Sequence, residues 1–289
     1  MVLKPAITVI GSGALGSAWI DYFRQAGFPI ASVWSSTSGM VYDTESGQKS
    51  ERDYSLPADG SEIGDIILIT TPDSVIQSVS EQLAKIDFDW SDKHVIHCSG
   101  SHPASILDSL AQTGAATASM HPIQTFKRGD DSDRLKNIYI SLQGEKSLVH
   151  RLEDIVKELN STPLILDENQ KKAVHISAVF ASNYLVALLN TSDTILKDHG
   201  VKEGVNILEP LIRQTLKNIL ERGAVNSLTG PISRGDSSTV QGHLENLSSD
   251  SDKEKKSLYV ELGRVCLGIV KKQDTLTDEQ ISDLEKLLG

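Results

Sequence analysis

The chain has 289 residues, of which 39% are hydrophobic and 23% are charged. This is a normal globular balance, and the length suggests two domains. The formal net charge of −11 gives no electrostatic attraction for nucleic acid or for an anionic membrane, so we expect neither as a partner. Cys98 and Cys266 are far apart and have no metal-ligand spacing, so we expect no disulfide and no metal site. Residues 1–5 lack a signal-peptide pattern, which favours a cytoplasmic protein.

Short apolar segments alternate with helical ones from residue 6 to about residue 166. The expected strands are residues 6–10, 30–34, 65–70, 94–97, 116–119, 138–142 and 163–166. The expected helices between them are residues 14–26, 73–85, 103–112 and 146–160. Apolar strands that alternate with helices predict a parallel sheet covered on both faces. The polar stretch 35–59 is interpreted as loops around a short edge element.

A glycine-rich loop joins the first expected strand to the first expected helix. Its residues, all candidates for cofactor binding, are Gly11, Ser12, Gly13, Ala14, Leu15 and Gly16. The first glycine permits a tight turn, the second lets the backbone approach a pyrophosphate, and the third allows close packing of the helix on the strand. The free N–H groups at the helix N-terminus provide the anion site. The loop therefore predicts a dinucleotide-binding βαβ unit.

The second strand ends where an acidic residue would bind the ribose of NAD. The sequence has Ser35, Ser36 and Thr37 there, and the first acid beyond them is Asp43. Hydroxyl and backbone N–H groups can accept a 2′-phosphate, and no carboxylate repels it. This favours NADP as the cofactor, with NAD as the alternative.

In open α/β sheets the ligand lies beyond the carboxyl ends of the strands. Thr71 and Pro72 follow the strand 65–70 and are predicted to contact the cofactor, while Asp73 is predicted to cap the next helix. Ser99 follows the strand 94–97 and either orients a substrate or only shapes a turn, with Ser101 as a helix cap. His121, held extended by Pro122, is a candidate for proton transfer or substrate binding.

The sequence becomes helical after residue 167, which predicts domains at residues 1–167 and 168–289. Helices are expected at residues 168–197, 203–222, 238–246, 253–272 and 277–288. On the long first helix, Lys171, His175 and Ser182 share a direction, with Asn183 on the flank. This polar stripe either forms hydrogen bonds within a dimer core or closes over the cofactor. The apolar part of this helix is expected to be buried in the protein rather than in a membrane.

A glycine- and proline-rich loop, residues 224–237, contains Arg234 and Asp236. Arg234 is a candidate for binding a substrate carboxylate through two hydrogen bonds. Asp236 is interpreted either as an orienting partner of Arg234 or as a helix cap. The alternative for both is an exposed ion pair on a turn.

These motifs resemble those of Rossmann-like oxidoreductases with an uncharacterised helical C-terminal domain, a family similar to pyrroline-5-carboxylate reductase and, more distantly, to 6-phosphogluconate dehydrogenase. The resemblance rests on residues 11–16 and 97–101, His121-Pro122, His175 with Ser182-Asn183, and residues 228–236 with His243. It implies an NADP-binding domain, an all-helical second domain and a homodimer formed through the long helix. Related hydroxyacid dehydrogenases have asparagine four residues after a lysine on this helix, where this chain has His175 after Lys171.

The sequence as a whole predicts an NADP-dependent oxidoreductase that transfers a hydride to or from a C=N or C=O bond of a small, carboxylate-bearing substrate. His121 or His175 would relay the proton, Ser99 and Asn183 would orient the substrate, and Arg234 would bind its carboxylate. One alternative is a prephenate-dehydrogenase-like enzyme, because His121-Pro122 and Ser99 are similar to residues of that family. Another is a non-catalytic NADP-binding sensor or assembly protein, which predicts an Arg234 exposed to solvent.

Overall fold

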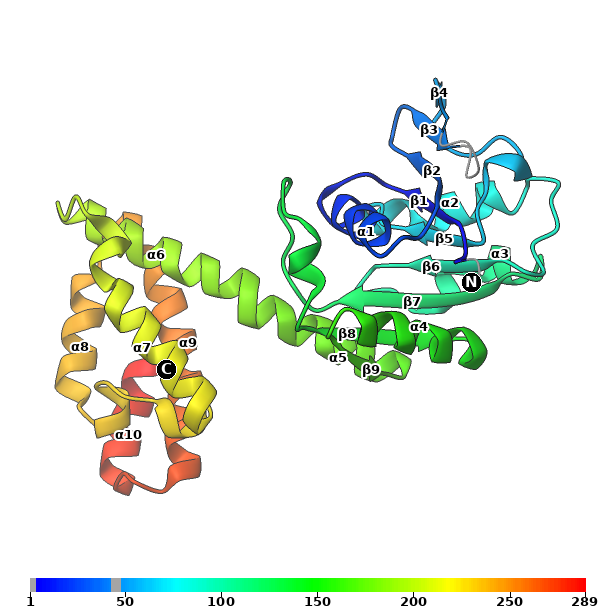
Figure 1. The fold of residues 1–289 in the computed structure, drawn as a ribbon. Coiled ribbons are helices and arrows are strands. Elements are labelled where there is room, and N and C mark those ends of the chain that lie inside the picture. The colour runs from blue at the N-terminus through cyan, green and yellow to red at the C-terminus, as the bar shows by residue number, and fades with distance from the viewer. Residues whose placement is uncertain (1–3, 43–47) are drawn as a thin grey trace. The chain divides into compact units, whose positions relative to one another are not determined.

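The computed structural model describes residues 4–42 and 48–289. Contacts within the chain divide it into two compact units, Met1–Ser182 and Asn183–Gly289. Residues 1–3 and Asp43, both considered above, lie outside the described residues. The first unit is a sheet covered by helices, and the second is helical (Figure 1).

The described part of the first unit contains a nine-stranded sheet in the order β4-β3-β2-β1-β5-β6-β7-β8-β9. The strands are β1 Ile7–Ile10, β2 Ile30–Trp34, β3 Gly39–Tyr42, β4 Lys49–Arg52, β5 Ile66–Ile69, β6 His94–His97, β7 Ala116–Pro122, β8 Tyr139–Gly144 and β9 Thr162–Ile165. The neighbouring strands β2, β1, β5, β6 and β7 pair in parallel. The Rossmann-type α/β architecture expected from the sequence is therefore confirmed.

The expectation of a wholly parallel sheet is wrong at three pairings. β3 and β4 form an antiparallel extension of β2, within the stretch 35–59 that was interpreted mainly as loops. The turn from β2 to β3 is too short for the crossover that parallel strands require. β8 also runs antiparallel to β7, because only the short 3₁₀ turn Ser132–Leu135, and no crossover helix, interrupts the connection between them.

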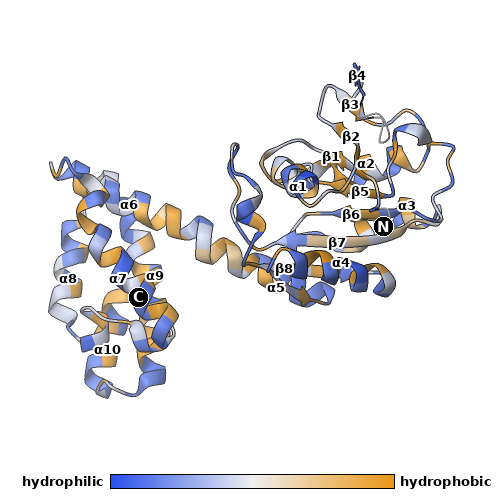
Figure 2. Cartoon of the chain, viewed as in Figure 1, coloured by the Kyte–Doolittle hydropathy of each residue, from blue (hydrophilic) through white to orange (hydrophobic). Residues whose placement is uncertain are grey.

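Helices cover both faces of the sheet. α1, Ala14–Gln25, and α4, Lys146–Glu158, pack on the face of β1 that carries Ile7 and Val9. α2, Ile76–Leu83, and α3, Asp108–Ala111, pack on the other face. Both are shorter than expected, because each is preceded by a 3₁₀ turn, Asp73–Val75 or Ala104–Leu107, that follows a proline. The apolar strands lie inside these two layers (Figure 2).

One helical segment connects the two units. It comprises α5, Glu168–Val179, the π-helical turn Phe180–Tyr184, and α6, Leu185–Asp198. The expected burial of its apolar part is not found in the single chain, where the exposed fraction is 58% for Ile176 and 67% for Val186. The whole segment is long and apolar enough to cross a membrane, a property that core helices of soluble proteins share.

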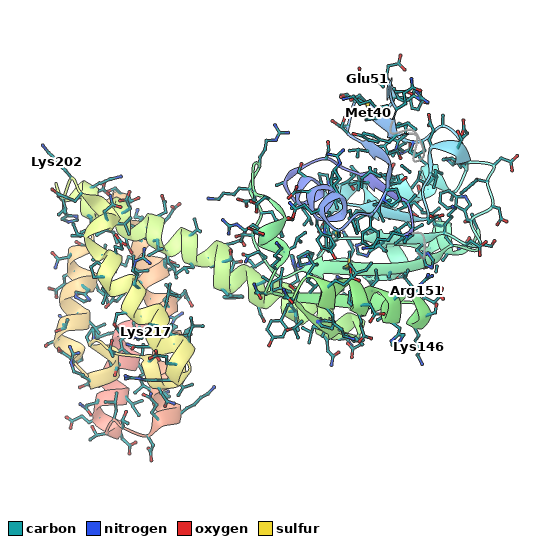
Figure 3. All side chains as sticks on the ribbon, viewed as in Figure 1. Met40, Glu51, Lys146, Arg151, Lys202 and Lys217 are labelled. Carbon is teal, nitrogen blue, oxygen red and sulfur yellow. The ribbon has the colours of Figure 1, made fainter. Side chains whose placement is uncertain are left out.

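The second unit contains α7, Glu209–Arg222, α8, Ser237–Asn246, α9, Lys253–Gln273, and α10, Asp278–Leu288. Its small core is formed by Val240, Leu244, Leu267, Leu284 and Leu288. Thr277 and Gln280 form a capping box at the start of α10. Exposed lysines such as Lys202 and Lys217 occupy the surface of this unit (Figure 3).

Candidate functional site

The glycine loop has the geometry that a pyrophosphate site needs. Gly11 has a φ of +104°, and a Cβ atom there would lie 2.8 Å from the backbone at Thr70 and Thr71. A Cβ atom at Gly16 would lie 1.9 Å from the Gly11 carbonyl oxygen, so the helix and loop touch at that point. Gly13, by contrast, has open space on its side-chain side. Gly13 is also the N-cap of α1, which has no side-chain cap and no acidic residue in its first turn. The loop therefore leaves helix N–H groups available to an anion.

The predicted 2′-phosphate position forms the turn between β2 and β3. Ser35 Oγ accepts hydrogen bonds from the backbone N–H groups of Thr37 and Ser38, at 3.3 and 3.1 Å. Ser36 and Thr37 are exposed, and within the described chain no hydrogen bond engages their hydroxyl groups. Ser35 thus shapes the turn, and the next two hydroxyls are available to a ligand.

The strand β5 ends beside the glycine loop. Thr70 Oγ1 donates to the Gly11 carbonyl oxygen at 2.5 Å, which ties the two strand ends together. Thr71 Oγ1 is buried and has no hydrogen-bond partner among the described residues. An unpaired buried hydroxyl is unfavourable unless a ligand or water satisfies it. Thr71 therefore fits the predicted role in cofactor binding.

The loop after β6 is held by a buried histidine that sequence reasoning assigned no role. His97 Nε2 donates to the Pro103 carbonyl oxygen at 3.1 Å, and His97 Nδ1 accepts from the Ser99 N–H group at 3.2 Å. Burial lowers the pKa of His97 to about 3, so its ring is neutral. Ser99 Oγ accepts from the N–H groups of Ser101 and His102. The structure therefore uses the Ser99 hydroxyl in the turn, although Ser99 also lines the cavity described below.

His121 is oriented by its neighbour on the adjacent strand end. Its Nδ1 donates to the Cys98 carbonyl oxygen at 3.0 Å, which leaves Nε2 with a free electron pair. Burial lowers the pKa of His121 to about 4, despite the stabilising hydrogen bond to Cys98. A Cβ atom at Gly100 would lie 2.7 Å from both His121 Nε2 and His175 Nδ1, so these two nitrogens face the same point. Both histidines expected in the site are thus brought together.

Lys171 is a candidate that the sequence placed in the polar stripe but not among the catalytic residues. Its side chain is buried, and Nζ donates to the Ser99 carbonyl oxygen and to Ser119 Oγ, both at 2.7 Å. Burial lowers the pKa of Lys171 to about 8. A buried amine is unfavourable unless it has a task, and perturbed groups of this kind gather at active sites. The sequence feature that could have identified Lys171 as a site residue is its place in the polar stripe of an otherwise apolar helix.

Two cap predictions at the strand ends are wrong. Asp73 does not cap α2, because Pro72 holds the N-cap position of the 3₁₀ turn, and Asp73 Oδ2 instead accepts from Ser101 Oγ at 2.6 Å. Ser101 likewise does not cap the next turn, whose N-cap is Pro103. Burial disfavours the charged form of Asp73, but hydrogen bonds from Ser101 and Ser99 outweigh it and lower the pKa of this carboxyl. The hydrogen bond between Ser101 and Asp73 therefore links the segments that follow β5 and β6.

These groups surround a cavity of about 240 Å³ at the carboxyl end of the parallel strands. Its lining includes Thr71, Asp73, Ser99, His121 and His175. Leu15 of the glycine loop borders it as well, so the cavity adjoins the predicted cofactor site. Gln124 and Phe126, which sequence reasoning missed, complete the lining from the segment after β7.

Two predicted catalytic residues are not part of this cavity. Asn183 is exposed on the π-helical turn, and Arg234 is exposed on the 3₁₀ turn Ile232–Arg234 of the helical unit. Asp236 is a helix cap, the second of its two interpretations: it accepts from the Thr239 N–H group at 3.0 Å. Hydrogen bonds from Thr239 lower the pKa of Asp236 to about 2.

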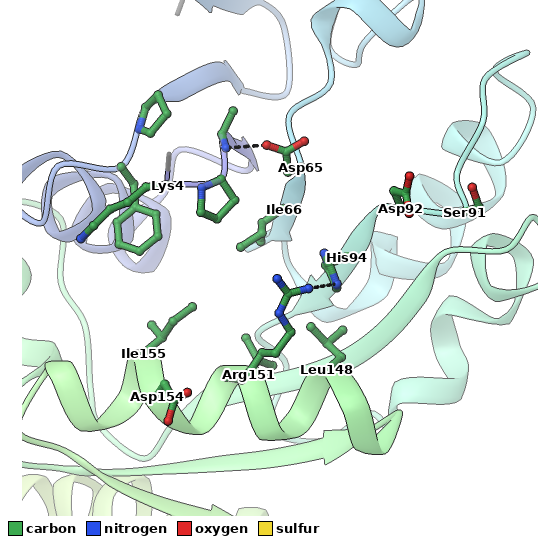
Figure 4. A pocket seen from close by; sticks show the side chains of 15 residues that line it. Lys4, Asp65, Ile66, Ser91, Asp92, His94, Leu148, Arg151, Asp154 and Ile155 are labelled. Atoms are coloured by element: carbon green, nitrogen blue, oxygen red, sulfur yellow. Dashed lines mark hydrogen bonds between the residues drawn. The ribbon is translucent and has the colours of Figure 1, made fainter. Parts of the chain in front are cut away.

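A larger cavity, of about 850 Å³, lies at the amino ends of β1, β5 and β6 (Figure 4). Lys4, Asp65, His94 and Arg151 line it, and Arg151 Nη1 donates to His94 Nε2 at 2.9 Å. It contains none of the predicted site residues. Because it lies at the amino ends of the strands, away from the glycine loop, we do not assign the reaction to it.

Two domain models match the sequence. Residues 3–122 match a Rossmann-like domain, and residues 138–266 match a domain of unknown function, DUF2520. A search of curated proteins finds no match.

Several solved structures have a similar fold. BF3122 from Bacteroides fragilis, to which an NADP oxidoreductase role is provisionally assigned, is 20% identical with a TM-score of 0.71, over 92% of this chain and 99% of that one. TM1727 from Thermotoga maritima is 22% identical with a TM-score of 0.68, over 92% and 99% of the two chains. An imine reductase from Myxococcus stipitatus in complex with NADP⁺ is 17% identical with a TM-score of 0.59, over 99% and 100%. These solved structures share the fold of the chain, whose sequence matches the Rossmann-like model in residues 3–122 and the DUF2520 model in residues 138–266.

Proposed function

We propose that the protein is an NADP-dependent oxidoreductase that transfers a hydride to or from a C=N or C=O bond of a small, carboxylate-bearing substrate. The observation that carries this proposal is the cavity at the strand ends, where His121 and His175 face one point beside the glycine loop. Neighbours in fold that are named as NADP-dependent enzymes support it.

The residues present fit a dinucleotide with a 2′-phosphate. The uncapped N-terminus of α1 suits the pyrophosphate, and the open side of Gly13 leaves room for it. The exposed hydroxyls of Ser36 and Thr37 would receive the 2′-phosphate, and Thr71 and Pro72 would flank the nicotinamide side. When bound, the cofactor supplies or accepts the hydride. NAD is the alternative cofactor.

The side chains around the cavity would manage the proton. His121 is neutral at physiological pH with Nε2 unprotonated, so it accepts a hydrogen bond or a proton from the substrate. That state suits the N–H group of a protonated imine, or the hydroxyl group of an alcohol in the oxidative direction. His175 is the alternative relay. Lys171 is a positioning residue, because its two hydrogen bonds hold the loop at Ser99 and the strand β7 at Ser119.

Ser99, Asn183 and Arg234 complete the proposed site. Ser99 would orient the substrate within the cavity, and Asn183 would do so from the π-helical turn, a feature that is frequent at functional sites. Arg234 would bind the substrate carboxylate. The exposure of Arg234 is also what the alternative of a non-catalytic NADP sensor or assembly protein predicts.

We further propose a cytoplasmic homodimer formed through the long helix. Ile176 and Val186 on this helix, and Leu211 and Leu220 on α7, are exposed by 58%, 67%, 63% and 86% in the single chain. Exposed apolar surface of this extent is typical of protein–protein interfaces. A second copy of the chain would bury it.

Cofactor titration followed by a substrate screen tests the proposed function. NADPH and NADH fluorescence would be followed during titration with the protein, and imino acids and keto acids would then be screened for cofactor oxidation. Tight NADPH binding with turnover of one substrate class supports the proposal. Release of CO₂ from prephenate would favour the prephenate-dehydrogenase-like alternative. Tight binding without turnover would favour the non-catalytic one.

A further inference from the structure

The helical unit has a cavity of its own, of about 260 Å³. One wall is formed by Leu228, Pro231 and Ile232 of the loop before α8, and the other by Leu262 and Cys266 of α9. This loop carries the motif of residues 228–236, which the proposed chemistry uses only through Arg234. The other residues of the motif that line the cavity are therefore not used by the proposed chemistry.

One polar pair interrupts the apolar lining. His243 of α8 and Tyr259 of α9 both line the cavity, and His243 Nδ1 lies 2.8 Å from the Tyr259 hydroxyl oxygen. Their rings are perpendicular, with centroids 5.7 Å apart. The lining includes no lysine, arginine or carboxylate among the described residues. The cavity therefore offers apolar contact and hydrogen bonding, but no charge.

The loop that forms one wall of this open cavity is held in place from several sides. Gly230 has a φ of +97°, which favours glycine, and Pro231 follows it. Asp236 caps α8 through its bond from Thr239, and Gln280 Nε2 donates to the Arg234 carbonyl oxygen at 3.3 Å. These contacts keep the loop from collapsing into the space beneath it. A preformed apolar cavity with few polar groups is the usual form of a small-molecule site.

The volume limits what the cavity can hold. An apolar cavity of about 150 Å³ is large enough to bind benzene, so 260 Å³ accommodates a substituted six-membered ring. We propose that this cavity binds a single aromatic or alicyclic ring that carries one hydrogen-bonding substituent, which the His243–Tyr259 pair recognises. Such a ring has two sources: it is part of the substrate, which rests on the proposed function, or it belongs to a separate effector.

Cys266 provides a probe of occupancy, with phenol as the test ligand. Cys98 serves as an internal reference, because it is buried and burial raises its pKa to about 12. N-ethylmaleimide should therefore modify Cys266 selectively, and peptide mass spectrometry would follow the reaction. We expect phenol at ten times its dissociation constant to slow this modification about ten-fold. Unchanged modification of Cys266 in saturating phenol would overturn the proposal.

Three substitutions test the location and the polar recognition. Cys266→Phe fills the cavity and should abolish phenol binding measured by calorimetry, whereas Val265→Phe, at an adjacent position that is 62% exposed, should leave it unchanged. Tyr259→Phe keeps the ring and removes the hydroxyl, and should weaken phenol binding roughly three- to ten-fold. If phenol binds Cys266→Phe and Tyr259→Phe as tightly as it binds the wild type, the proposal is contradicted. Dissociation of a dimer by phenol would also contradict it, because the cavity would then be an interface between copies.

The same measurements separate this proposal from the proposed function. Calorimetry with phenol needs no turnover, so phenol can bind even if no substrate is found. Likewise, turnover of an imino or keto acid without phenol binding would refute the cavity proposal alone. Once a substrate is known, competitive inhibition by phenol would assign the ring to the substrate, and non-competitive inhibition or activation would assign it to an effector.

Discussion

The two units differ in their unfavourably placed side chains, which are buried polar groups in the first unit and exposed apolar groups in the second. Around the cavity of the first unit, charged and polar groups such as Lys171 and His97 are buried and held by hydrogen bonds. In the helical unit, apolar side chains such as Leu211 and Leu220 are exposed to solvent instead. A buried polar group that is positioned indicates chemistry, whereas an exposed apolar group indicates a missing partner. On the proposed function, the first unit therefore provides the groups that handle the proton, and the second provides Asn183, Arg234 and the surface for a partner.

The largest expected effect is a loss of NADPH affinity, which substitutions at two glycines of the cofactor loop would test. Gly13→Val should fold normally, because no atom lies near the added side chain, but should reduce NADPH affinity at least about 100-fold by occupying the pyrophosphate space. Gly16→Val should instead destabilise the fold, because its Cβ atom meets the Gly11 carbonyl oxygen. Fluorescence titration and thermal denaturation would separate the two. Normal NADPH binding by Gly13→Val would refute the cofactor assignment.

A charge on the long helix tests the role of the exposed apolar surface. Val186→Glu should convert a dimer into a monomer, because it places a carboxylate in the interface. Ser105→Glu adds the same charge at an exposed position of the 3₁₀ turn Ala104–Leu107, outside the long helix and α7, and serves as the matched control. Sedimentation velocity would report the mass of each variant. A wild-type monomer, or a dimer that survives Val186→Glu, would contradict the predicted interface.

The buried amine of the first unit predicts a pH-dependent stability. Because burial lowers the pKa of Lys171 from 10.5 to about 8, the unfolded chain holds a proton between these pH values that the folded chain releases. The free energy of unfolding should therefore rise with pH in this window, by on the order of 3 kcal/mol. Lys171→Met should remove that rise, and urea denaturation between pH 7.5 and pH 10 would measure it. The same slope in both proteins would show that Lys171 is not the group responsible.

The smallest effect concerns the choice between the two cofactors. Replacing both Ser36 and Thr37 by alanine should weaken NADPH binding roughly three- to ten-fold, because two neutral hydrogen bonds are lost, and should leave NADH binding unchanged. Ser257→Ala, at an exposed position of α9 in the helical unit, is a suitable control. A parallel loss for both cofactors would place the 2′-phosphate elsewhere.

The sequence predicted local features well where the role of a residue follows from its type and its near neighbours in the chain. The glycine loop, the apolar strands and the Thr277–Gln280 capping box follow from conformational or hydrogen-bonding rules that act within a few residues. Only one short edge element was expected where the antiparallel β3–β4 hairpin lies, because β4 is polar and largely exposed. Periodicity identifies strands by burial, so it does not detect such edges.

The site was harder to predict because its geometry depends on long-range contacts. Asp73 was expected to be a cap, yet its partner Ser101 lies 28 residues away. Lys171 was recognised as part of a polar stripe, but its contact with Ser99 joins positions 72 residues apart. The position of His121 beside a cavity could be predicted from the sequence, because the strand ends follow from the topology.

The most direct test of the central claim is the effect of His121→Ala on turnover. With the substrate found in the screen, this variant should bind NADPH as tightly as the wild type and should lose about 100-fold or more in kcat. Between pH 5 and pH 7 the wild-type rate should not change through His121, because the pKa of His121 is about 4. Unchanged turnover in His121→Ala would refute His121 as the proton relay, and unchanged turnover in His175→Ala as well would show that the cavity at the strand ends is not the reaction site.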